Sequence, residues 1–258
     1  YFKEYGRGML STVSFRGTTA SQTAVIWNGI NVNSQLNGSA DFNTFTAPDF
    51  NTISIKAGGG SVSYGSGAIG GTVHLSNDLV FKNKFENDLR LDYGSFNTIG
   101  VNYKMILSNQ KWSTQVGFSR NSSDNDYTYV NKYTWNGIQR KNENGQYATT
   151  NLYANVGYKV NPNSVVTFYS QSSNTDRNLS LIAESDSKTK YVNTFSRNLL
   201  EYSITKDRFS SNYKVAYLTE QYQYFENIDS DDFSFGKSES LIAKMDFAYQ
   251  LLEFIKLN

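Results

Sequence analysis

The chain has 258 residues, with 24 basic and 23 acidic side chains, one histidine and no cysteine. This near-neutral charge leaves no basic surface to neutralise phosphates, so we expect no nucleic-acid partner. The lack of cysteine excludes disulfides, cysteine nucleophiles and cysteine-containing zinc sites. The 19 tyrosines and 17 phenylalanines, beside only 2 prolines, favour strands over helices.

No run of 18 apolar residues occurs in the chain, so we expect no transmembrane helix. A membrane location through strands stays compatible with the sequence, because a transmembrane β-barrel places apolar residues only at alternate positions. The chain opens on Tyr1 and Phe2 with no visible signal peptide. Either the mature protein starts there or a preceding segment is missing.

Residues 1–77 form the first predicted domain, which is rich in glycine and asparagine. A buried strand is predicted at residues 23–27 and ends at Asn28-Gly29, a strong turn signal. Further strands are predicted at residues 53–56 and 72–75. We therefore expect a compact unit built from short strands and many turns.

The glycine-rich run at residues 65–70 formally matches the dinucleotide fingerprint G-x-G-x-x-G. That fingerprint must open a helix, whereas here a predicted strand at residues 72–75 follows. The single histidine, His74, lies in the same strand without a recognisable catalytic partner. Neither feature indicates an enzyme.

Residues 78–258 form the second predicted domain, whose segments alternate apolar and polar residues with a period of two. In the last segment, the apolar face carries Leu241, Met245, Phe247 and Leu251, and the polar face carries Lys244, Asp246 and Gln250. We expect the apolar face to contact lipid and the polar face to line a lumen. Eight such strands are predicted, beginning near Asn87, Thr98, Lys111, Ala148, Ser164, Asn193, Ser211 and Ser240.

The connections between these strands alternate in length. Tight turns are predicted at residues 108–110, 161–163 and 206–208, and long polar loops at residues 121–146, 172–192 and 227–237. Only the first connection, around residues 94–97, is short on the side of the long loops. Short turns at one end and long loops at the other are typical of outer-membrane β-barrels. A soluble β-sandwich is the alternative, although its strands are usually shorter.

Three motifs carry a resemblance to a known family: residues 14–22 (SFRGTTASQ), residues 27–33 (WNGINVN) and residues 64–71 (YGSGAIGG). Together they resemble the plug domain of TonB-dependent outer-membrane receptors, and residues 38–41 (GSAD) resemble its vitamin B12 transporter branch. The resemblance implies an all-β fold, a transmembrane antiparallel β-barrel with an N-terminal plug domain. It places the protein in the outer membrane of a Gram-negative bacterium.

The resemblance implies active uptake of a scarce nutrient and no enzymatic activity. The expected partners are TonB, a small nutrient ligand and outer-membrane lipid, and a surface lipoprotein is left open. A corrinoid such as cobalamin is the first ligand expected, with an iron siderophore or haem as the alternative. A soluble β-rich adhesin and an outer-membrane enzyme are the other classes of protein considered.

Two departures from the family pattern indicate a fragment. The TonB box expected before the plug is missing, and eight strands enclose too little space for a plug of 77 residues. We therefore expect the first eight strands of a larger barrel.

Arg16 lies in the first plug motif, in a segment that looks like a buried plug strand, and the resemblance implies that it locks the plug to the barrel. A buried guanidinium needs a carboxylate or several carbonyls as partners. Glu201 and Asp246 are the candidate acids, and a local turn contact inside the plug is the alternative.

The resemblance also implies a ligand site at the plug apex. Asn33, Gln35 and Asn37 offer amides that could match those of a corrinoid, or could bind only the loop's own backbone. Four aromatic residues of the first long loop could cover the ligand by stacking: Tyr127, Tyr129, Tyr133 and Trp135. In the same loop, Asp124 and Asp126 could hold calcium, a hard cation that prefers oxygen ligands, or simply be solvated.

Overall fold

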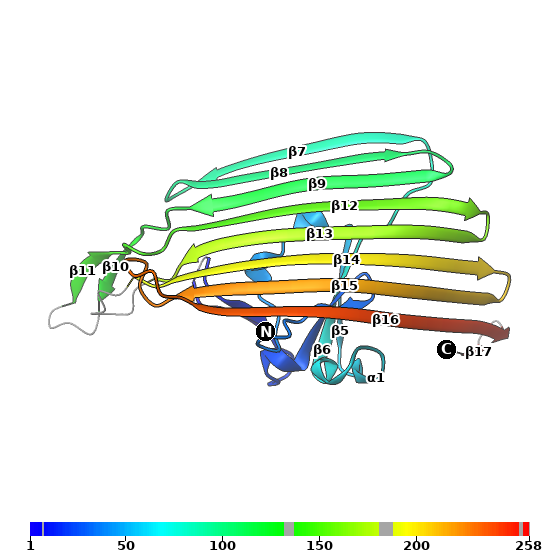
Figure 1. Ribbon diagram of the computed structural model, residues 1–258, viewed down its shortest axis with the longest axis horizontal. Coiled ribbons are helices and arrows are strands. Elements are labelled where there is room, and N and C mark those ends of the chain that lie inside the picture. Colours follow the sequence, from blue (N-terminus) through cyan, green and yellow to red (C-terminus); the bar gives the residue numbers. More distant parts are fainter. Residues whose placement is uncertain (7, 132–136, 181–187, 253–254, 258) are drawn as a thin grey trace.

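The computed structural model describes residues 1–6, 8–131, 137–180, 188–252 and 255–257. Its larger part is one curved antiparallel sheet in which successive long strands are hydrogen-bonded neighbours, the barrel sheet (Figure 1). All eight predicted strands are confirmed. In chain order the strands are β7 (Lys84–Gly94), β8 (Thr98–Ser108), β9 (Trp112–Ser123), β12 (Tyr147–Asn161), β13 (Ser164–Asn178), β14 (Lys190–Lys206), β15 (Phe209–Phe225), β16 (Ser234–Leu252) and the short β17 (Ile255–Leu257).

The two faces of the barrel sheet have the predicted opposite character. Leu241 and Met245 are 76% and 65% exposed on the outer face of β16. Lys244, between them in sequence, lies on the inner face, where its Nζ sits 4.8 Å from the ring of Tyr64 in the plug. The predicted alternation of apolar outer and polar inner residues is therefore confirmed for this strand.

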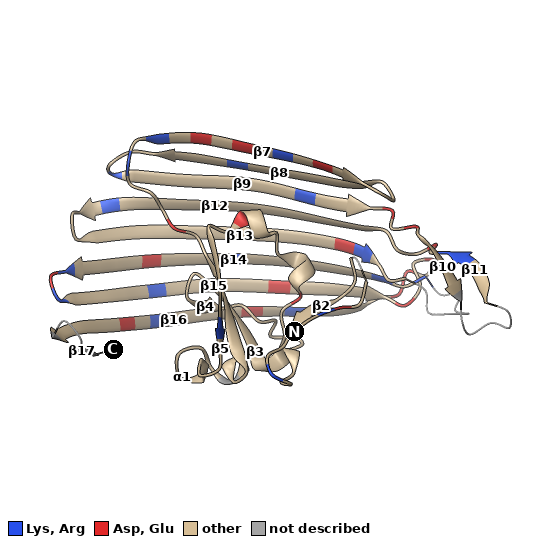
Figure 2. Ribbon diagram, turned by 180° about the vertical axis from the view of Figure 1, so that it is seen from behind, with Lys and Arg blue, Asp and Glu red and all other residues tan. Residues whose placement is uncertain are grey.

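Charged residues occur along the length of β7 (Figure 2). Phe85, Leu89 and Leu91 are exposed on the outer face. Asp88 and Arg90 alternate with them and form an ion pair of 2.7 Å. Charge is thus kept off the outer face of β7, as expected for a face that contacts lipid.

The connections alternate in length as predicted. Short turns join β8 to β9, β12 to β13 and β14 to β15 at one end, and the longer connections lie at the other end (Figure 1). The expected exception is also present, since the connection from β7 to β8, residues 95–97, is short at the end of the long connections. The longest of these contains a hairpin not predicted from the sequence, β10 (Thr128–Asn131) with β11 (Ile138–Lys141). Strands of 15 to 19 residues exceed the roughly 9–11 residues that cross a bilayer, so they extend beyond it.

The N-terminal region, called the plug here, packs against the inner face of the barrel sheet (Figure 1). The three predicted strands are confirmed within a four-stranded sheet of order β4-β3-β6-β5. A separate hairpin joins the first two strands. The strands are β1 (Phe2–Glu4), β2 (Ser11–Val13), β3 (Thr23–Trp27), β4 (Ile30–Asn31), β5 (Thr52–Ala57) and β6 (Gly71–Ser76).

Only short helices occur in the described part of the plug: η1 (Ala20–Gln22), η2 (Phe42–Thr44), η3 (Ala47–Asp49), α1 (Ser61–Tyr64) and η4 (Ser66–Ala68). Among the described helices, none is long and apolar enough to cross a membrane. The glycine-rich run leads into β6, as expected, and not into a helix that could hold a pyrophosphate. The domain boundary after residue 77 remains a prediction.

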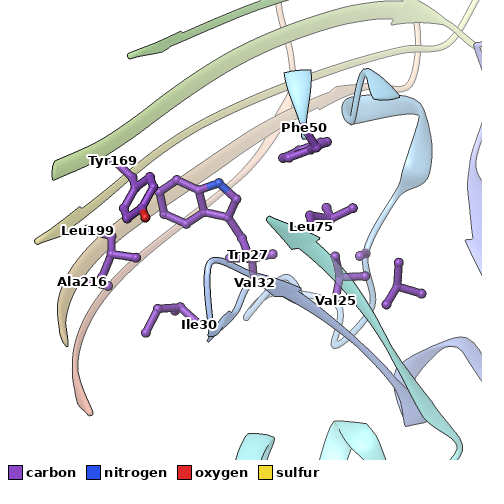
Figure 3. Packing of buried hydrophobic residues seen from close by; sticks show 11 residues of the cluster. Val25, Trp27, Ile30, Val32, Phe50, Leu75, Tyr169, Leu199 and Ala216 are labelled. Carbon is purple, nitrogen blue, oxygen red and sulfur yellow. The ribbon is translucent and has the colours of Figure 1, made fainter. Parts of the chain in front are cut away.

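A mixed core joins the plug to the barrel sheet (Figure 3). The Trp27 indole, 1% exposed, meets Tyr169 of β13 edge-on at a ring distance of 6.3 Å. Leu199 and Ala216, from β14 and β15, belong to the same cluster and are fully buried. Burial of these apolar surfaces fixes where the plug sits on the sheet.

A candidate ligand cavity between plug and barrel sheet

A cavity of about 450 Å³ lies between the plug and the inner face of the barrel sheet, at the end that carries the long connections. Its volume falls within the range of small-molecule sites. The plug side is the apex loop, residues 32–45, and the barrel side comes from β13 to β16. Apolar groups prevail in its lining, including Met9, Leu10, Val32, Ala40, Phe45, Leu179, Phe195 and Leu218.

The three predicted amides of the apex loop all line this cavity, so the structure brings them together. Asn33, however, is buried and holds the loop itself. Its Oδ1 accepts the backbone N–H of Val25 at 2.8 Å, and its Nδ2 donates to Thr23 O at 2.9 Å. This agrees with the alternative in which the Asn33 side chain forms its hydrogen bonds with nearby backbone groups of the plug.

Gln35 and Asn37 are less committed to the loop. Gln35 Nε2 donates one long hydrogen bond to Asn33 O, at 3.4 Å. Asn37 accepts the backbone N–H of Ser39 at 3.1 Å through its side-chain oxygen. Both therefore retain hydrogen-bonding capacity toward the cavity, and their contact with a ligand stays a prediction.

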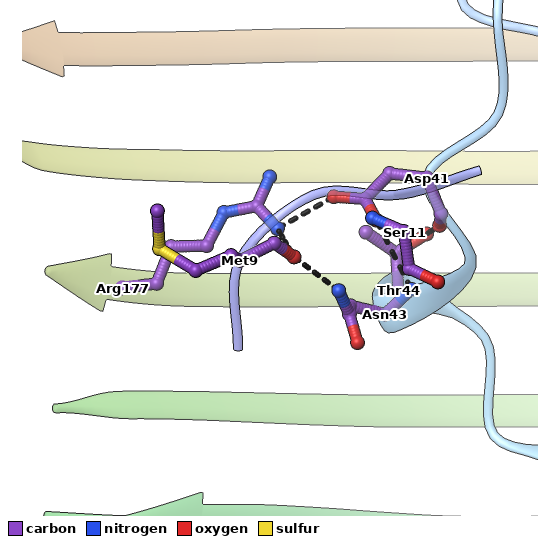
Figure 4. Close-up of polar contacts among 6 residues, drawn as sticks. All are labelled: Met9, Ser11, Asp41, Asn43, Thr44 and Arg177. Atoms are coloured by element: carbon purple, nitrogen blue, oxygen red, sulfur yellow. Dashed lines mark hydrogen bonds and ion pairs between the residues drawn. The ribbon is translucent and has the colours of Figure 1, made fainter. Parts of the chain in front are cut away.

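Arg177 of β13 and Asp41 of the apex loop both line the cavity and form an ion pair (Figure 4). Arg177 Nη1 lies 2.5 Å from Asp41 Oδ2, and the two side chains are 7% and 13% exposed. The same Nη1 donates to Met9 O at 3.2 Å, and Asp41 Oδ1 accepts the Ser11 backbone N–H at 3.1 Å. One barrel arginine thereby holds two separate plug segments.

The sequence does not predict Arg177 as a plug contact, because residues 172–192 have the composition of a long polar loop. The strand β13 in fact continues to Asn178. Residues there are polar on both faces, so the apolar alternation that reveals a strand inside the bilayer is absent. The side chains of Gln171, Ser173, Thr175 and Arg177 are all buried in the structure. Since their neighbours in the sequence are polar too, the sequence carries no signal for this continuation of the strand.

A second arginine, Arg197 of β14, forms part of the cavity wall. It is 8% exposed, and its guanidinium lies 3.7 Å from the ring centroid of Phe195 and 4.9 Å from that of Phe45. Its Nη1 donates to Gln171 Oε1 at 3.4 Å. These aromatic faces stabilise a cation that is largely removed from water.

Away from the cavity, Asp49 of the plug is buried against the inner face of β8 and β9. Its carboxylate accepts hydrogen bonds from Ser119 Oγ at 3.4 Å and Asn102 Nδ2 at 3.5 Å. Burial raises the pKa of Asp49 to about 7, and these long hydrogen bonds only partly oppose the shift. This plug–barrel contact therefore contains a carboxyl group that titrates near neutral pH.

The predicted position of Arg16 is wrong in one respect. The residue is exposed, in a turn with φ +48°, and does not lie in a buried strand. Thr18 closes this turn, since its Oγ1 donates to Phe15 O at 2.7 Å. Its role as a plug–barrel lock has no supporting contact among the described residues and remains a prediction.

The two acids proposed as partners of Arg16 instead face lysines. Glu201 lies 3.4 Å from Lys214 and Asp246 lies 3.4 Å from Lys244. Lys214 also donates to Asn28 O of the plug at 2.7 Å, at the turn after β3. Barrel cations that reach plug carbonyls thus provide the contact that Arg16 was expected to make.

The aromatic residues predicted to cover the ligand lie in or beside the long connection. Tyr127 packs against Phe96 and Tyr129, with ring distances of 6.3 Å each, and neither tyrosine lines the cavity. Tyr133 and Trp135 lie outside the described residues. Their predicted stacking on a ligand stays untested.

The proposed calcium ligands are engaged with other side chains. Asp126 forms an ion pair with Lys141 at 2.5 Å, and Asp124 accepts a hydrogen bond from Asn97 at 2.6 Å. Among the described residues, no group of three or more acidic or histidine side chains is placed to hold a metal. Calcium binding remains a prediction without geometric support.

Comparison with known families identifies the N-terminal region. Residues 2–72 match the model of the TonB-dependent Receptor Plug Domain. The vitamin B12 transporter BtuB of Vibrio vulnificus (strain YJ016) is 31% identical over 90 residues, which cover 35% of this chain and 14% of that protein. The chain spans only a small part of the curated relative.

Solved structures share the arrangement of plug and sheet. The FrpB iron transporter of Neisseria meningitidis (F3-3 variant) superposes with a TM-score of 0.73 at 14% identity, covering 95% of this chain and 41% of that one. The siderophore receptor PirA of Acinetobacter baumannii gives a TM-score of 0.73 at 16% identity, covering 95% and 40%. The chain therefore has the same fold over less than half of their length.

Proposed function

We propose that this chain, which belongs to the TonB-dependent receptors of the Gram-negative outer membrane, captures a scarce nutrient in the plug–barrel cavity for active uptake. The observation that carries this proposal is the position of the cavity. It lies at the long-connection end of the strands, and its floor is the plug itself. Entry to the periplasm then requires the plug to move, which is the step that TonB would energise.

The proposed ligand is a corrinoid. Support comes from the partial sequence match to a vitamin B12 transporter and from the neutral amides of Gln35 and Asn37 at the cavity. These amides can pair with the peripheral amides of a corrin ring. An iron siderophore or haem is the second candidate, favoured by the apolar and aromatic lining and by the iron and siderophore transporters of the same fold.

We further propose that the protein makes and breaks no covalent bond in its cargo. The residues that line the cavity include arginines, amides and aromatic groups. Such groups bind and orient a ligand, while the surrounding ion pairs hold the plug. The proposed activity is binding followed by a conformational step.

The direct test is uptake of radiolabelled cyanocobalamin by cells that express the full-length protein as their only cobalamin receptor. Uptake is expected with TonB present and absent from a strain lacking TonB. Ferric siderophore and haem uptake are measured in parallel. If only iron enters the cells, the corrinoid assignment is wrong and the second candidate replaces it.

A paired substitution tests the cavity. Gln35→Ala with Asn37→Ala is expected to weaken cyanocobalamin binding about five- to hundredfold, because each lost hydrogen bond costs roughly 0.5–1.5 kcal/mol. Asn33 is left intact because its buried hydrogen bonds hold the loop. Asn51→Ala, an exposed plug residue outside the cavity, is the control. Calorimetry on the detergent-solubilised protein gives both affinities, and equal values for the pair and the wild type would place the ligand elsewhere.

A further inference from the structure

The cavity contains a buried cation whose charge is not matched by an ion pair. Among the described residues, no carboxylate oxygen comes within 4.0 Å of the Arg197 guanidinium. A guanidinium has five N–H donors. The single hydrogen bond in the described structure runs from Nη1 to Gln171 at 3.4 Å, which is long.

The two arginines of the cavity therefore differ in what they can offer. Arg177 is neutralised by Asp41 at 2.5 Å and also holds Met9. Arg197 has only aromatic rings and one amide around it. A ligand anion would have to displace a carboxylate from Arg177, but it could reach Arg197 without breaking an ion pair.

Glu220 is the acidic residue that acts on Arg197 electrostatically. It lies on β15 opposite Phe195 in the strand register and also lines the cavity. Because it stays beyond ion-pair distance, it weakens the positive potential at Arg197 without removing it. Its charge gives an independent way to change that potential without touching the arginine.

We infer that Arg197 is the docking point for a negatively charged oxygen group, so that the cavity takes an amphipathic anion with an apolar body. The planar guanidinium matches a carboxylate or phosphate through two parallel hydrogen bonds. Phe45, Phe195 and Leu218 provide the surface for the apolar body. The phosphodiester of a corrinoid, the carboxylates of haem and the phenolates of a catecholate siderophore share this chemistry.

This inference rests on the proposed function but can be tested apart from it, with a small probe and its neutral analogue. Binding of 1-naphthoate and of 1-naphthamide to the detergent-solubilised full-length protein is compared by calorimetry, after subtraction of empty micelles. The wild type is expected to prefer the carboxylate by roughly ten- to hundredfold, as for a charge-assisted hydrogen-bonded pair.

Substitutions assign that preference to one side chain. Arg197→Gln is expected to abolish it, Arg197→Lys to retain part of it, and Glu220→Gln to increase it. Arg120→Gln, whose arginine is exposed and does not line the cavity, is the matched control and should leave it unchanged. Thermal unfolding of each variant shows whether the fold is retained.

Several outcomes would overturn the inference. Equal affinity for the two naphthalene probes, no binding of either probe, or a preference that survives in a folded Arg197→Gln protein would each do so. Cyanocobalamin, haem and ferric catecholate are then added as competitors. Displacement of 1-naphthoate supports the inference and identifies the source of the anion, whereas a ligand that binds without displacing it contradicts the inference. If none of these three competitors binds, the result counts against the proposed function. The inference about Arg197 is then tested only by the comparison of 1-naphthoate with 1-naphthamide.

Discussion

The plug meets the barrel sheet through two regions of opposite chemistry. Around Trp27, apolar side chains of the plug pack into a cluster with Tyr169, Leu199 and Ala216 (Figure 3). Around Asp49, the contact consists of polar side chains, and Asn151 Oδ1 and Tyr153 Oη are buried without a hydrogen-bond partner among the described residues.

The difference separates two tasks. Burial of apolar surface is non-directional and stabilising, so the Trp27 region determines where the plug rests. Buried polar atoms that lack partners cost free energy, so the Asp49 region holds the plug less firmly. A plug that must both stay in place and move needs a firmly held region, such as the one around Trp27, and a less firmly held region, such as the one around Asp49.

The largest effect is expected at Trp27. Trp27→Ala should lower the free energy of plug unfolding by about 3–5 kcal/mol, the usual cost of removing a large buried aromatic side chain. Pulse proteolysis of the full-length protein in guanidinium chloride measures this. Val62→Ala, at a fully exposed plug position, should change nothing. A loss below about 1 kcal/mol at Trp27 would remove the distinction between the two regions.

The Arg177–Asp41 pair should come next. Arg177→Met or Asp41→Asn alone leaves an uncompensated buried charge, which typically costs about 3–5 kcal/mol. The double variant should cost less than the sum of the two, because neither charge is then left unpaired. The same proteolysis assay measures the unfolding free energy of the wild type, of both single variants and of the double variant. If the loss in unfolding free energy of the double variant equalled the sum of the two single losses, the interaction between Arg177 and Asp41 would contribute nothing to plug stability.

A smaller effect is expected at Lys214, and none at Arg16. Lys214→Met combined with Glu201→Gln removes the hydrogen bond from a charged donor to Asn28 O without leaving Glu201 as an unpaired charge, and should cost roughly 1.5–3 kcal/mol of plug stability relative to Glu201→Gln alone. Arg16→Met should be neutral because the side chain is exposed. If Arg16→Met destabilised the plug and the Lys214 substitution did not, Arg16 and not Lys214 would be the residue that locks the plug to the barrel.

The smallest effect is a pH dependence from Asp49. Its pKa is about 7 in the docked plug and about 4 when unfolded, so the docked state binds more protons between these values and stability falls as pH rises. From pH 6 to pH 8 the loss should be about 1.4 kcal/mol. Lys104 is the cation that acts on this carboxylate, and its charge partly opposes the effect of burial. Asp49→Asn should abolish this slope, and a slope unchanged in the variant would assign it to another group.

The sequence by itself determined the eight long strands, their apolar outer face and the alternation of short and long connections. These features depend on local rules. A period of two puts every second side chain on one face, and turn-forming residues end a strand at their own position in the sequence. The plug motifs likewise identified the N-terminal region. All of these features are encoded in neighbouring residues.

Only the tertiary structure decided which side chains meet across the cavity. Arg177 and Asp41 are 136 positions apart, and the residues that neighbour each of them in the sequence do not indicate that the two side chains form an ion pair. The strands leave the bilayer before they end, so the apolar pattern that marks them stops before Arg177. For Arg16, the local motif predicts a buried side chain, whereas the structure places the residue in a turn with φ +48° and exposes its side chain. Local periodicity fixes a strand and its faces, whereas contacts between the plug and the barrel depend on how the two parts pack.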